Sequence, residues 1–188
     1  RCVCVEETAL AAPPKRRWVC DSGVGSTEII IGEGLTPLAL ESLTIGCVRW
    51  SEQFFADGRL SQKRIARARL AARLAIEPYQ AAFRRRGWDE AVGSAGTVRA
   101  IGDAVRELLP ASTAITVDGL ELILAELAAL QHIRELPLKT VDVERRKSFA
   151  GGVAILAEIF DQLGIEEMRV AEGAMREGLL YDLLGRYL

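Results

Sequence analysis

The stretch that most constrains the fold is residues 18–31, where two short apolar runs, residues 18–20 and 29–31, flank a turn rich in glycine, hydroxyl and carboxylate groups. The β-branched isoleucines of the second run suit a buried strand, and the shorter first run has the same character. Between the runs, Gly23 and Gly25 let the backbone turn sharply and bring its N–H groups close to a ligand. A concave row of N–H groups binds anions such as phosphate. The stretch therefore predicts a β-hairpin with a phosphate-binding tip, although Asp and Gly also favour turns for purely local reasons.

The hairpin also carries two carboxylates at the ends of its strands. Asp21 ends the first strand and could hold a hard cation such as Mg²⁺, directly or through water. Glu28 enters the second strand and could orient an attacking water. We therefore expect the hairpin to serve a reaction at phosphate.

A second candidate site is a loop of small residues that follows a short predicted strand and opens a helix, with Gly93, Ser94, Gly96 and Thr97. Free N–H groups and the positive end of the helix dipole make such a place a natural anion site. The alternative is a plain connection between a strand and a helix. Two loops suited to phosphate in one small domain favour a functional role for both.

The rest of the chain predicts an alternation of strands and helices. After the hairpin we expect further strands at 37–45, 89–92 and 168–170. We expect a short helix near 52–55, a long helix from 62 to about 85, a helix that opens at 93–97 and runs to 109, a helix at 117–133, a helix that ends at 163 and a last helix at 173–188. Ser61 is a candidate N-cap for the long helix, which Pro78 should kink or divide. A meander followed by helical crossovers gives an α/β fold with a mixed five-stranded sheet flanked by helices, the ribonuclease H-like layout of the actin, Hsp70 and sugar-kinase superfamily.

Two features of the predicted helices have more than one interpretation. Gly151 and Gly152 weaken a helix by about 1 kcal/mol each, so they indicate a close contact, tight helix packing or a loop before the helix. The side of the long helix opposite its apolar face is basic, with Lys63, Arg64, Arg67 and Arg73. This side either guides a polyanion or is simply a solvated face.

Composition limits the function classes. The 188 residues fit one domain or one and a half, and the net charge of −2 argues against a general nucleic-acid binder. No stretch reaches the roughly 18–20 uninterrupted apolar residues of a membrane span, so we expect no membrane partner. The cysteines, Cys2, Cys4, Cys20 and Cys47, lack the spacing of a recognisable zinc site, and reduced structural thiols predict a cytoplasmic protein. The chain begins at Arg1 without a signal peptide, so we expect a fragment of a longer protein.

Five motifs in order resemble one family. Residues 21–28 (D-S-G-V-G-S-T-E) are similar to D-I-G-G-G-S-T-E, residues 45–49 to G-x-V-R, and residues 93–100 to G-T-A-G-T-x-x-A. Residues 144–156 are similar to E-R-K-x-x-F-x-x-G-x-A-I-L, and residues 173–181 to G-x-L-R-E-G-x-L-Y. Together these motifs resemble the exopolyphosphatase / guanosine pentaphosphate phosphohydrolase (Ppx/GppA) family.

The resemblance implies a Mg²⁺-dependent hydrolase that removes terminal phosphate from polyphosphate or the 5′-phosphate from guanosine pentaphosphate. Its active site would lie between two ribonuclease H-like domains, with residues 16–188 as the second and residues 1–15 as a leader or tail of the preceding one. By motif position, Asp21 and Glu28 would hold metal, and Glu28 would also position water. The scissile phosphate would be cradled by Gly23, Gly25, Ser26 and Thr27, and the chain further along by Gly93, Ser94, Gly96 and Thr97. The full-length protein could also form a homodimer.

The chain departs from the family pattern in two ways. The catalytic-base Glu of the family lies in the first domain, and neither Glu6 nor Glu7 matches its motif, so we expect this chain alone to be inactive. Ser22 and Val24 stand where the family has isoleucine and glycine. These changes motivate an alternative, a non-catalytic module that binds polyphosphate or guanosine tetraphosphate. A sugar or acyl kinase of the same fold is a third hypothesis, which the motifs favour less.

Overall fold

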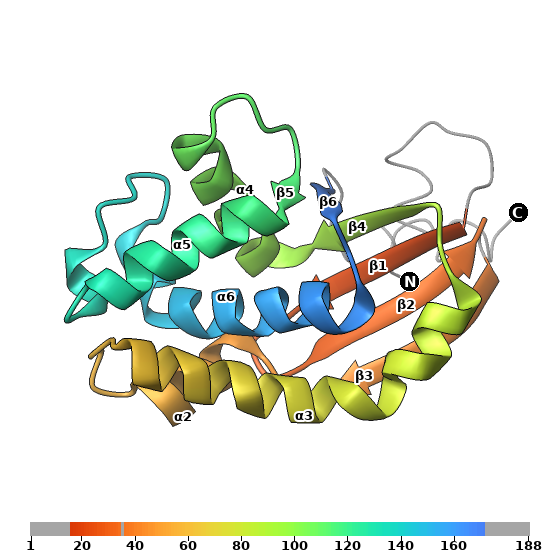
Figure 1. Cartoon of the computed structure of the whole chain (residues 1–188), viewed down its shortest axis with the longest axis horizontal. Coiled ribbons are helices and arrows are strands. Elements are labelled where there is room, and N and C mark those ends of the chain that lie inside the picture. The colour runs from red at the N-terminus through yellow and green to blue at the C-terminus, as the bar shows by residue number, and fades with distance from the viewer. Residues whose placement is uncertain (1–15, 35, 172–188) are drawn as a thin grey trace, which may run out of the picture.

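The computed structural model describes residues 16–34 and 36–171, which form a mixed sheet with helices packed against it (Figure 1). The strands are β1 (Arg16–Ser22), β2 (Thr27–Glu33), β3 (Thr36–Leu43), β4 (Glu90–Ser94), β5 (Ile115–Thr116) and β6 (Glu167–Val170). Their order in the sheet is β3-β2-β1-β4-β6-β5. The predicted leader, residues 1–15, and the predicted last helix, residues 173–188, lie outside the described residues.

The sheet confirms the predicted meander and crossovers. Strands β1, β2 and β3 pair antiparallel in sequence order, and β4 and β6 then add parallel to the β1 edge. The expectation of five strands was wrong by one, because β5 pairs antiparallel with β6 and extends the sheet. This strand has only two residues, too few to show an alternating pattern in the sequence.

The helices differ from expectation mainly at their ends. They are α2 (Cys47–Phe55), α3 (Gln62–Arg86), α4 (Ala95–Leu108), α5 (Val117–Ala129), the short η1 (Ile133–Glu135) and α6 (Val143–Leu163). The predicted helix near 52–55 begins five residues earlier, and the one predicted to reach 133 ends at Ala129. Ser61 caps α3 as predicted, since its hydroxyl accepts a hydrogen bond from the Arg64 N–H at 3.3 Å. Pro78 does not divide α3, whose yellow-green end is turned away from the line of the rest in Figure 1.

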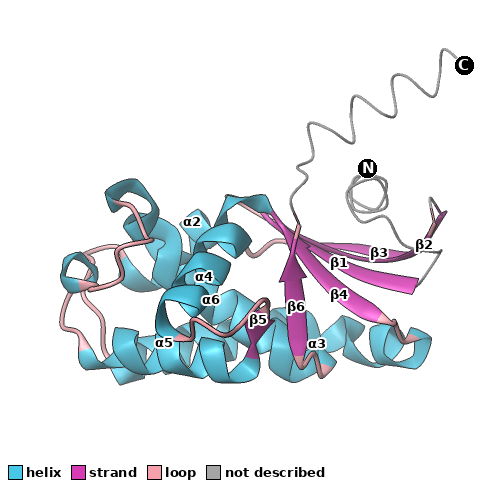
Figure 2. Ribbon diagram, turned by 90° about the horizontal axis from the view of Figure 1, so that it is seen from above, coloured by secondary structure: helices cyan, strands magenta, loops and turns pink. Residues whose placement is uncertain are grey.

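The two faces of the sheet have different surroundings. Figure 2 shows the described helices on one side of β1 to β4. On this side Trp18, Cys20, Ile29 and Ile31 are fully buried in the main core. The alternate side chains, such as Val19 and Ile30, belong to a separate small cluster on the other face. Because side chains alternate along a strand, the face of each residue near the hairpin tip follows from its position.

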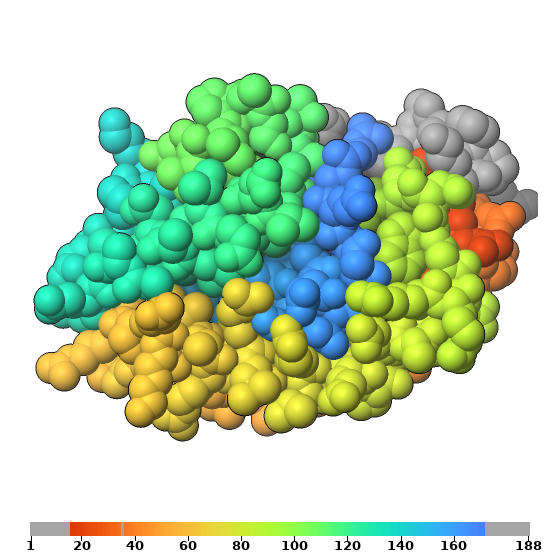
Figure 3. Space-filling view, viewed as in Figure 1, coloured from red at the N-terminus to blue at the C-terminus, as the bar shows by residue number. Residues whose placement is uncertain are grey.

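Helix α6 lies at the centre of the helical layer. It packs against α2, α3, α4 and α5, and nearly every residue from Phe149 to Phe160 is buried. In the space-filling view the blue surface of α6 shows between α3 and α5 (Figure 3). The glycine pair Gly151–Gly152 lies inside this helix. The interpretation of the two glycines as a loop that precedes the helix was therefore wrong. In the part of the chain that the structure describes, no helix combines the length and apolar character needed to cross a membrane.

Candidate functional site

A row of polar side chains crosses four strands beside the hairpin tip. In the strand register Asp21 lies opposite Glu28, and Glu28 lies opposite Ser42 of β3. On the other side of β1, Asp21 pairs with Ser94 of β4. Residues opposite one another on neighbouring strands share a face, so we call Ser42, Glu28, Asp21 and Ser94 the polar row. The row lies on the face of the sheet away from the described helices, because Cys20 and Ile29 beside it point into the helical core.

The carboxylate of Glu28 is held in a defined orientation. Its Oε1 atom accepts hydrogen bonds from Ser26 Oγ at 2.7 Å and from Ser42 Oγ at 2.8 Å. Hydrogen bonds to a charged acceptor are stronger than those between neutral groups. Sequence reasoning identified Ser26 but not Ser42, whose role depends on the pairing of β3 with β2.

The hairpin tip is held by the first turn of α2. The Cys47 N–H donates to the Gly23 carbonyl at 3.1 Å, and the N–H groups of Val48 and Arg49 donate to the Val24 carbonyl at 3.2 and 3.3 Å. These are N–H groups that have no partner within their own helix. Within residues 16–34 and 36–171, the backbone N–H groups of residues 24–26 donate no hydrogen bond. They are therefore available to a ligand.

The hairpin glycines have ordinary backbone angles. Neither Gly23, Val24 nor Gly25 has a positive φ, so the valine in the middle introduces no strain. A Cβ added at Gly25 would meet no atom within 4 Å, which leaves room for a ligand to approach the backbone. Gly46 is different, since its Cβ would lie 2.4 Å from the Val24 carbonyl oxygen. Sequence reasoning did not assign this contact to Gly46, which lets α2 approach the tip.

The second loop begins beside the polar row, where Ser94 ends β4 and α4 starts. Ser94 is buried, and its side chain makes no capping bond to α4. Ala95 has a φ of 77°, the one positive φ of a non-glycine residue in the described ranges. Such left-handed backbone costs an alanine on the order of 1–3 kcal/mol and is found more often at functional sites. The predicted arrangement of strand, small-residue loop and helix N-terminus is therefore present.

Arg145 reaches the second loop from the first turn of α6. A Cβ added at Gly96 would lie 2.4 Å from Arg145 Nη1, so the guanidinium lies directly against the N-terminal turn of α4. Its only close acidic neighbour within the described ranges is Asp142, at 3.7 Å. A cation beside the free N–H groups of a helix strengthens an anion site. The sequence showed Arg145 as part of a motif, but its position against Gly96 depends on how α6 packs.

Thr27, a predicted phosphate ligand, has a side chain with structural contacts instead. Thr27 is fully buried, and its hydroxyl donates to the Ile45 carbonyl at 2.6 Å. Ser22, opposite it, is also buried, with its hydroxyl 3.4 Å from that of Thr27. Both side chains point to the helical side of the sheet, away from Asp21 and Glu28. The structure therefore does not bring the Thr27 hydroxyl together with the polar row.

The oxygen ligands at the polar row are of the kind that Mg²⁺ prefers. Asp21 is 5% exposed and lies opposite the half-buried Glu28, so two carboxylates share one face. Among the residues that the structure describes, no group of three or more Asp, Glu, His or Cys side chains gathers to form a complete metal cage. Mg²⁺ typically uses one or two carboxylates and completes its shell with water and phosphate oxygens. Asp21 and Glu28 fit this requirement.

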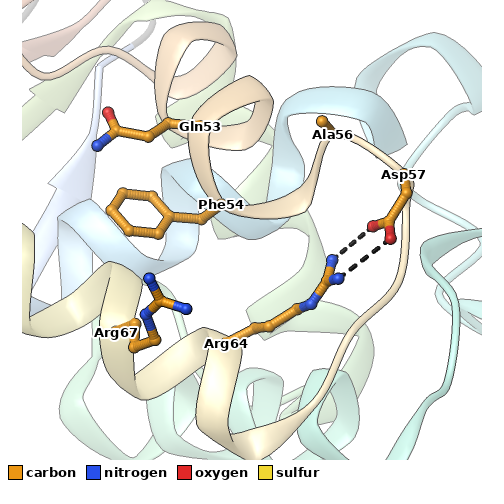
Figure 4. A pocket seen from close by; sticks show the side chains of 6 residues that line it. All are labelled: Gln53, Phe54, Ala56, Asp57, Arg64 and Arg67. Atoms are coloured by element: carbon orange, nitrogen blue, oxygen red, sulfur yellow. Dashed lines mark hydrogen bonds and ion pairs between the residues drawn. The ribbon is translucent and has the colours of Figure 1, made fainter.

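The basic side of α3 borders a different hollow, of about 440 Å³, between α2 and α3 (Figure 4). Arg64 binds both carboxylate oxygens of Asp57 there, and these hydrogen bonds, with one from the Arg59 backbone, lower the pKa of Asp57 to about 2. Arg73 is also engaged, with Glu158 and Asp161 of α6. Because the hollow lies at the end of α2 remote from the hairpin tip, roughly 13 Å along the helix, it is separate from the polar row.

The mixed sheet, its strand order and the helices that cross over it define an α/β domain of the ribonuclease H-like class. Comparison with known families makes the assignment more specific. The Ppx/GppA phosphatase family model matches residues 7–187, and the chain belongs to this family.

Individual relatives agree with this assignment. A protein of Haemophilus influenzae named "Putative exopolyphosphatase" is 38% identical over 168 residues, which cover 89% of this chain and 52% of the relative. A solved Ppx/GppA structure from Aquifex aeolicus matches with a TM-score of 0.77 and 20% identity, over 95% of this chain and 60% of that one. An exopolyphosphatase from Cytophaga hutchinsonii matches with a TM-score of 0.79 and 18% identity, over the same shares of the two chains. The chain thus spans about half the length of the curated relative, and the solved structures support the fold.

Proposed function

We propose that this chain forms the phosphate-binding half of an exopolyphosphatase, which hydrolyses the terminal phosphoanhydride bonds of inorganic polyphosphate. The single observation that supports this best is the polar row, where Asp21 and Glu28 lie on one face between two loops with free backbone N–H groups. Phosphoryl transfer needs little more than positioning and neutralisation of charge. The name of the Haemophilus influenzae relative agrees with this substrate class.

In this proposal the backbone binds the phosphates and the carboxylates serve the reaction. The N–H groups at Gly25 and Ser26 bind oxygens of the scissile phosphate, and the loop with Gly93, Ser94, Gly96 and Thr97 binds the next phosphates of the chain. Arg145 adds a positive charge at the second loop. Asp21 and Glu28 would hold Mg²⁺, which when bound neutralises charge on phosphate oxygens.

Glu28 has the catalytic role that its hydrogen bonds support. Because Ser26 and Ser42 both bind its Oε1 atom, its other oxygen is aimed in a constant direction and can orient a water for attack on phosphate. Such an oriented carboxylate acts without reorganising at the moment of reaction. Thr27 contributes by holding the hairpin, and its backbone rather than its hydroxyl faces the phosphate.

Several features of the whole protein belong to the same proposal. A first ribonuclease H-like domain supplies the catalytic base and closes the cleft over the polar row, so this chain alone is inactive. Guanosine pentaphosphate is the alternative substrate, since it carries the same phosphoanhydride bond. The full-length protein acts in the cytoplasm, where the buried thiols of Cys20 and Cys47 stay reduced, and it can pair as a homodimer.

The test measures phosphate release from polyphosphate, with guanosine pentaphosphate in parallel and Mg²⁺ present, by the full-length protein that contains this chain. We expect Asp21→Asn and Glu28→Gln each to lower kcat by on the order of 100-fold or more, as for other groups that stabilise the transition state. Glu52→Gln, a change at an exposed carboxylate of α2, is the matched control and should leave the rate unchanged. Wild-type rates in the two variants would overturn the site, and release by this chain alone would overturn the need for a first domain.

A non-catalytic binding module is the second candidate, and its motivation is the altered hairpin at Ser22 and Val24. The backbone angles weaken this motivation, since Val24 has no positive φ and is 67% exposed. Ser22 is accommodated beside Thr27 on the buried side. Neither residue removes an N–H group from the tip, so we favour the enzyme.

A further inference from the structure

Gly151 brings α6 into close contact with α2. Its N–H donates to the buried Ser51 Oγ at 3.1 Å. A Cβ added at Gly151 would lie 2.5 Å from Ser51 Oγ and 2.7 Å from the Cys47 carbonyl oxygen, closer than real Cβ atoms approach. Because Cys47 donates to the Gly23 carbonyl, α6 contacts the same turn of α2 that holds the hairpin tip.

Gly152, the next residue, brings α6 equally close to α4. A Cβ at Gly152 would lie 2.3 Å from Thr97 Cγ2, and Thr97 is the residue of the second loop that lies in the first turn of α4. Its distance to Cys47 Cβ would be 3.4 Å, which is an ordinary contact. Two adjacent glycines of one helix therefore touch α2, which holds the hairpin tip, and α4, which begins at the second loop.

We propose that Gly151 and Gly152 are positioning residues that set the separation of the hairpin tip and the second loop, so that both bind phosphates of one phosphoanhydride chain. This inference rests on the proposed function. Helix α6 is packed on several sides and cannot move aside, so a methyl group at either glycine displaces α2 or α4 instead. The loops move with these helices, because backbone hydrogen bonds join the tip to α2 and the second loop runs directly into α4.

The pair thereby selects a class of substrate. A phosphate monoester occupies one loop, whereas a chain of linked phosphates spans both. A change in loop separation lowers turnover of the chain, because a misplacement of about 1 Å costs on the order of 100-fold when two sites must engage one substrate.

The experiment is a double-mutant cycle between Gly152→Ala and Thr97→Ser in the full-length protein. Thr97→Ser removes the methyl group that the new Cβ would strike and keeps the hydroxyl. We measure kcat and KM for polyphosphate, and its Kd by calorimetry, at a temperature where every variant is folded. Ala72→Val in α3 is the control for crowding of the core, since Ala72 is fully buried but lies in a helix that belongs to neither loop.

We expect Gly152→Ala to lower kcat/KM by about tenfold or more when residue 97 is threonine. The same change should cost less than about threefold when residue 97 is serine, because the two positions are coupled. The control should lose stability without losing kcat/KM. Equal losses in both backgrounds, or an equal loss in Ala72→Val, would overturn the positioning role while the proposed function stands.

The cycle separates this inference from the function on which it rests. A wild-type protein that binds polyphosphate without releasing phosphate would overturn the enzyme, and the coupling would then be read from Kd. A wild-type protein that neither binds nor hydrolyses polyphosphate would overturn both.

Discussion

Thr27→Val is the sharpest test of how the hairpin tip is held. The Thr27 hydroxyl is buried and donates to the Ile45 carbonyl at 2.6 Å, just before α2 begins. Valine has nearly the same volume, so the change removes the donor without creating a large cavity. A buried carbonyl left without a partner costs about 1–3 kcal/mol. The nearby Ser22 hydroxyl lies 3.4 Å from that of Thr27 and loses this weak hydrogen bond as well.

The expected loss is large enough to measure by unfolding. For a chain of this size, 2 kcal/mol corresponds to a fall in Tm of about 4–8 °C. Urea unfolding followed by circular dichroism should show a lower midpoint with an unchanged m-value, because the surface exposed on unfolding stays the same. The matched control is Thr36→Val, the same change at an exposed position of β3, which should alter stability by less than about 0.5 kcal/mol.

Two results would refute this account of Thr27. One is a Thr27→Val variant within about 0.5 kcal/mol of the wild type, the range of neutral surface changes. The other is a variant of unchanged stability with a raised KM for polyphosphate in the full-length protein. That second result would place the hydroxyl on the substrate rather than on the Ile45 carbonyl.

Two further predictions concern the hairpin and the surface. Val24→Gly should change the rate of phosphate release by less than about threefold, because the valine already sits at an ordinary φ and no strain is relieved; a large gain would favour a decayed enzyme. Glu107 accepts hydrogen bonds from the backbone N–H groups of Lys139 and Thr140 and from the Thr140 hydroxyl, which hold its pKa below its usual value of 4.5. A lowered folded-state pKa means that the added stability is present above pH 4.5 and is lost as the pH falls through the folded value. The urea midpoint of the wild type should therefore fall as the pH is lowered below 4.5, and the midpoint of Glu107→Gln should fall less over the same pH range.

Local sequence signals identified most elements correctly because their causes are local. The apolar runs on either side of the hairpin became β1 and β2, since β-branched and aromatic side chains suit a buried strand. Ser61 was predicted as an N-cap, and its side chain accepts the expected backbone N–H. The errors fell where the local signal is short or contradictory. Strand β5 has two residues, and α2 starts before its most helical-looking residues because the hairpin tip accepts its first N–H groups.

The part of the candidate site that was predicted from the sequence is also the part with a local signal. Asp21 and Glu28 stand out because they flank a glycine-rich turn, and family motifs mark both loops. Ser42 and Arg145 could not be assigned roles from the sequence. Ser42 reaches Glu28 through the register of a second strand pair, and Arg145 reaches Gly96 across about 50 residues of chain.

The sequence by itself determined the family and all but one of the described strands, with most of the helices, because propensity, capping and short motifs act over a few neighbouring residues. Only the tertiary structure decided which side chains meet. It turned the Thr27 hydroxyl towards Ile45, brought Ser42 to the Glu28 carboxylate, and set the glycine pair of α6 against α2, which holds the hairpin tip, and α4, which begins at the second loop. Strand register and helix packing depend on contacts between residues far apart in the chain, and no local pattern specifies those contacts.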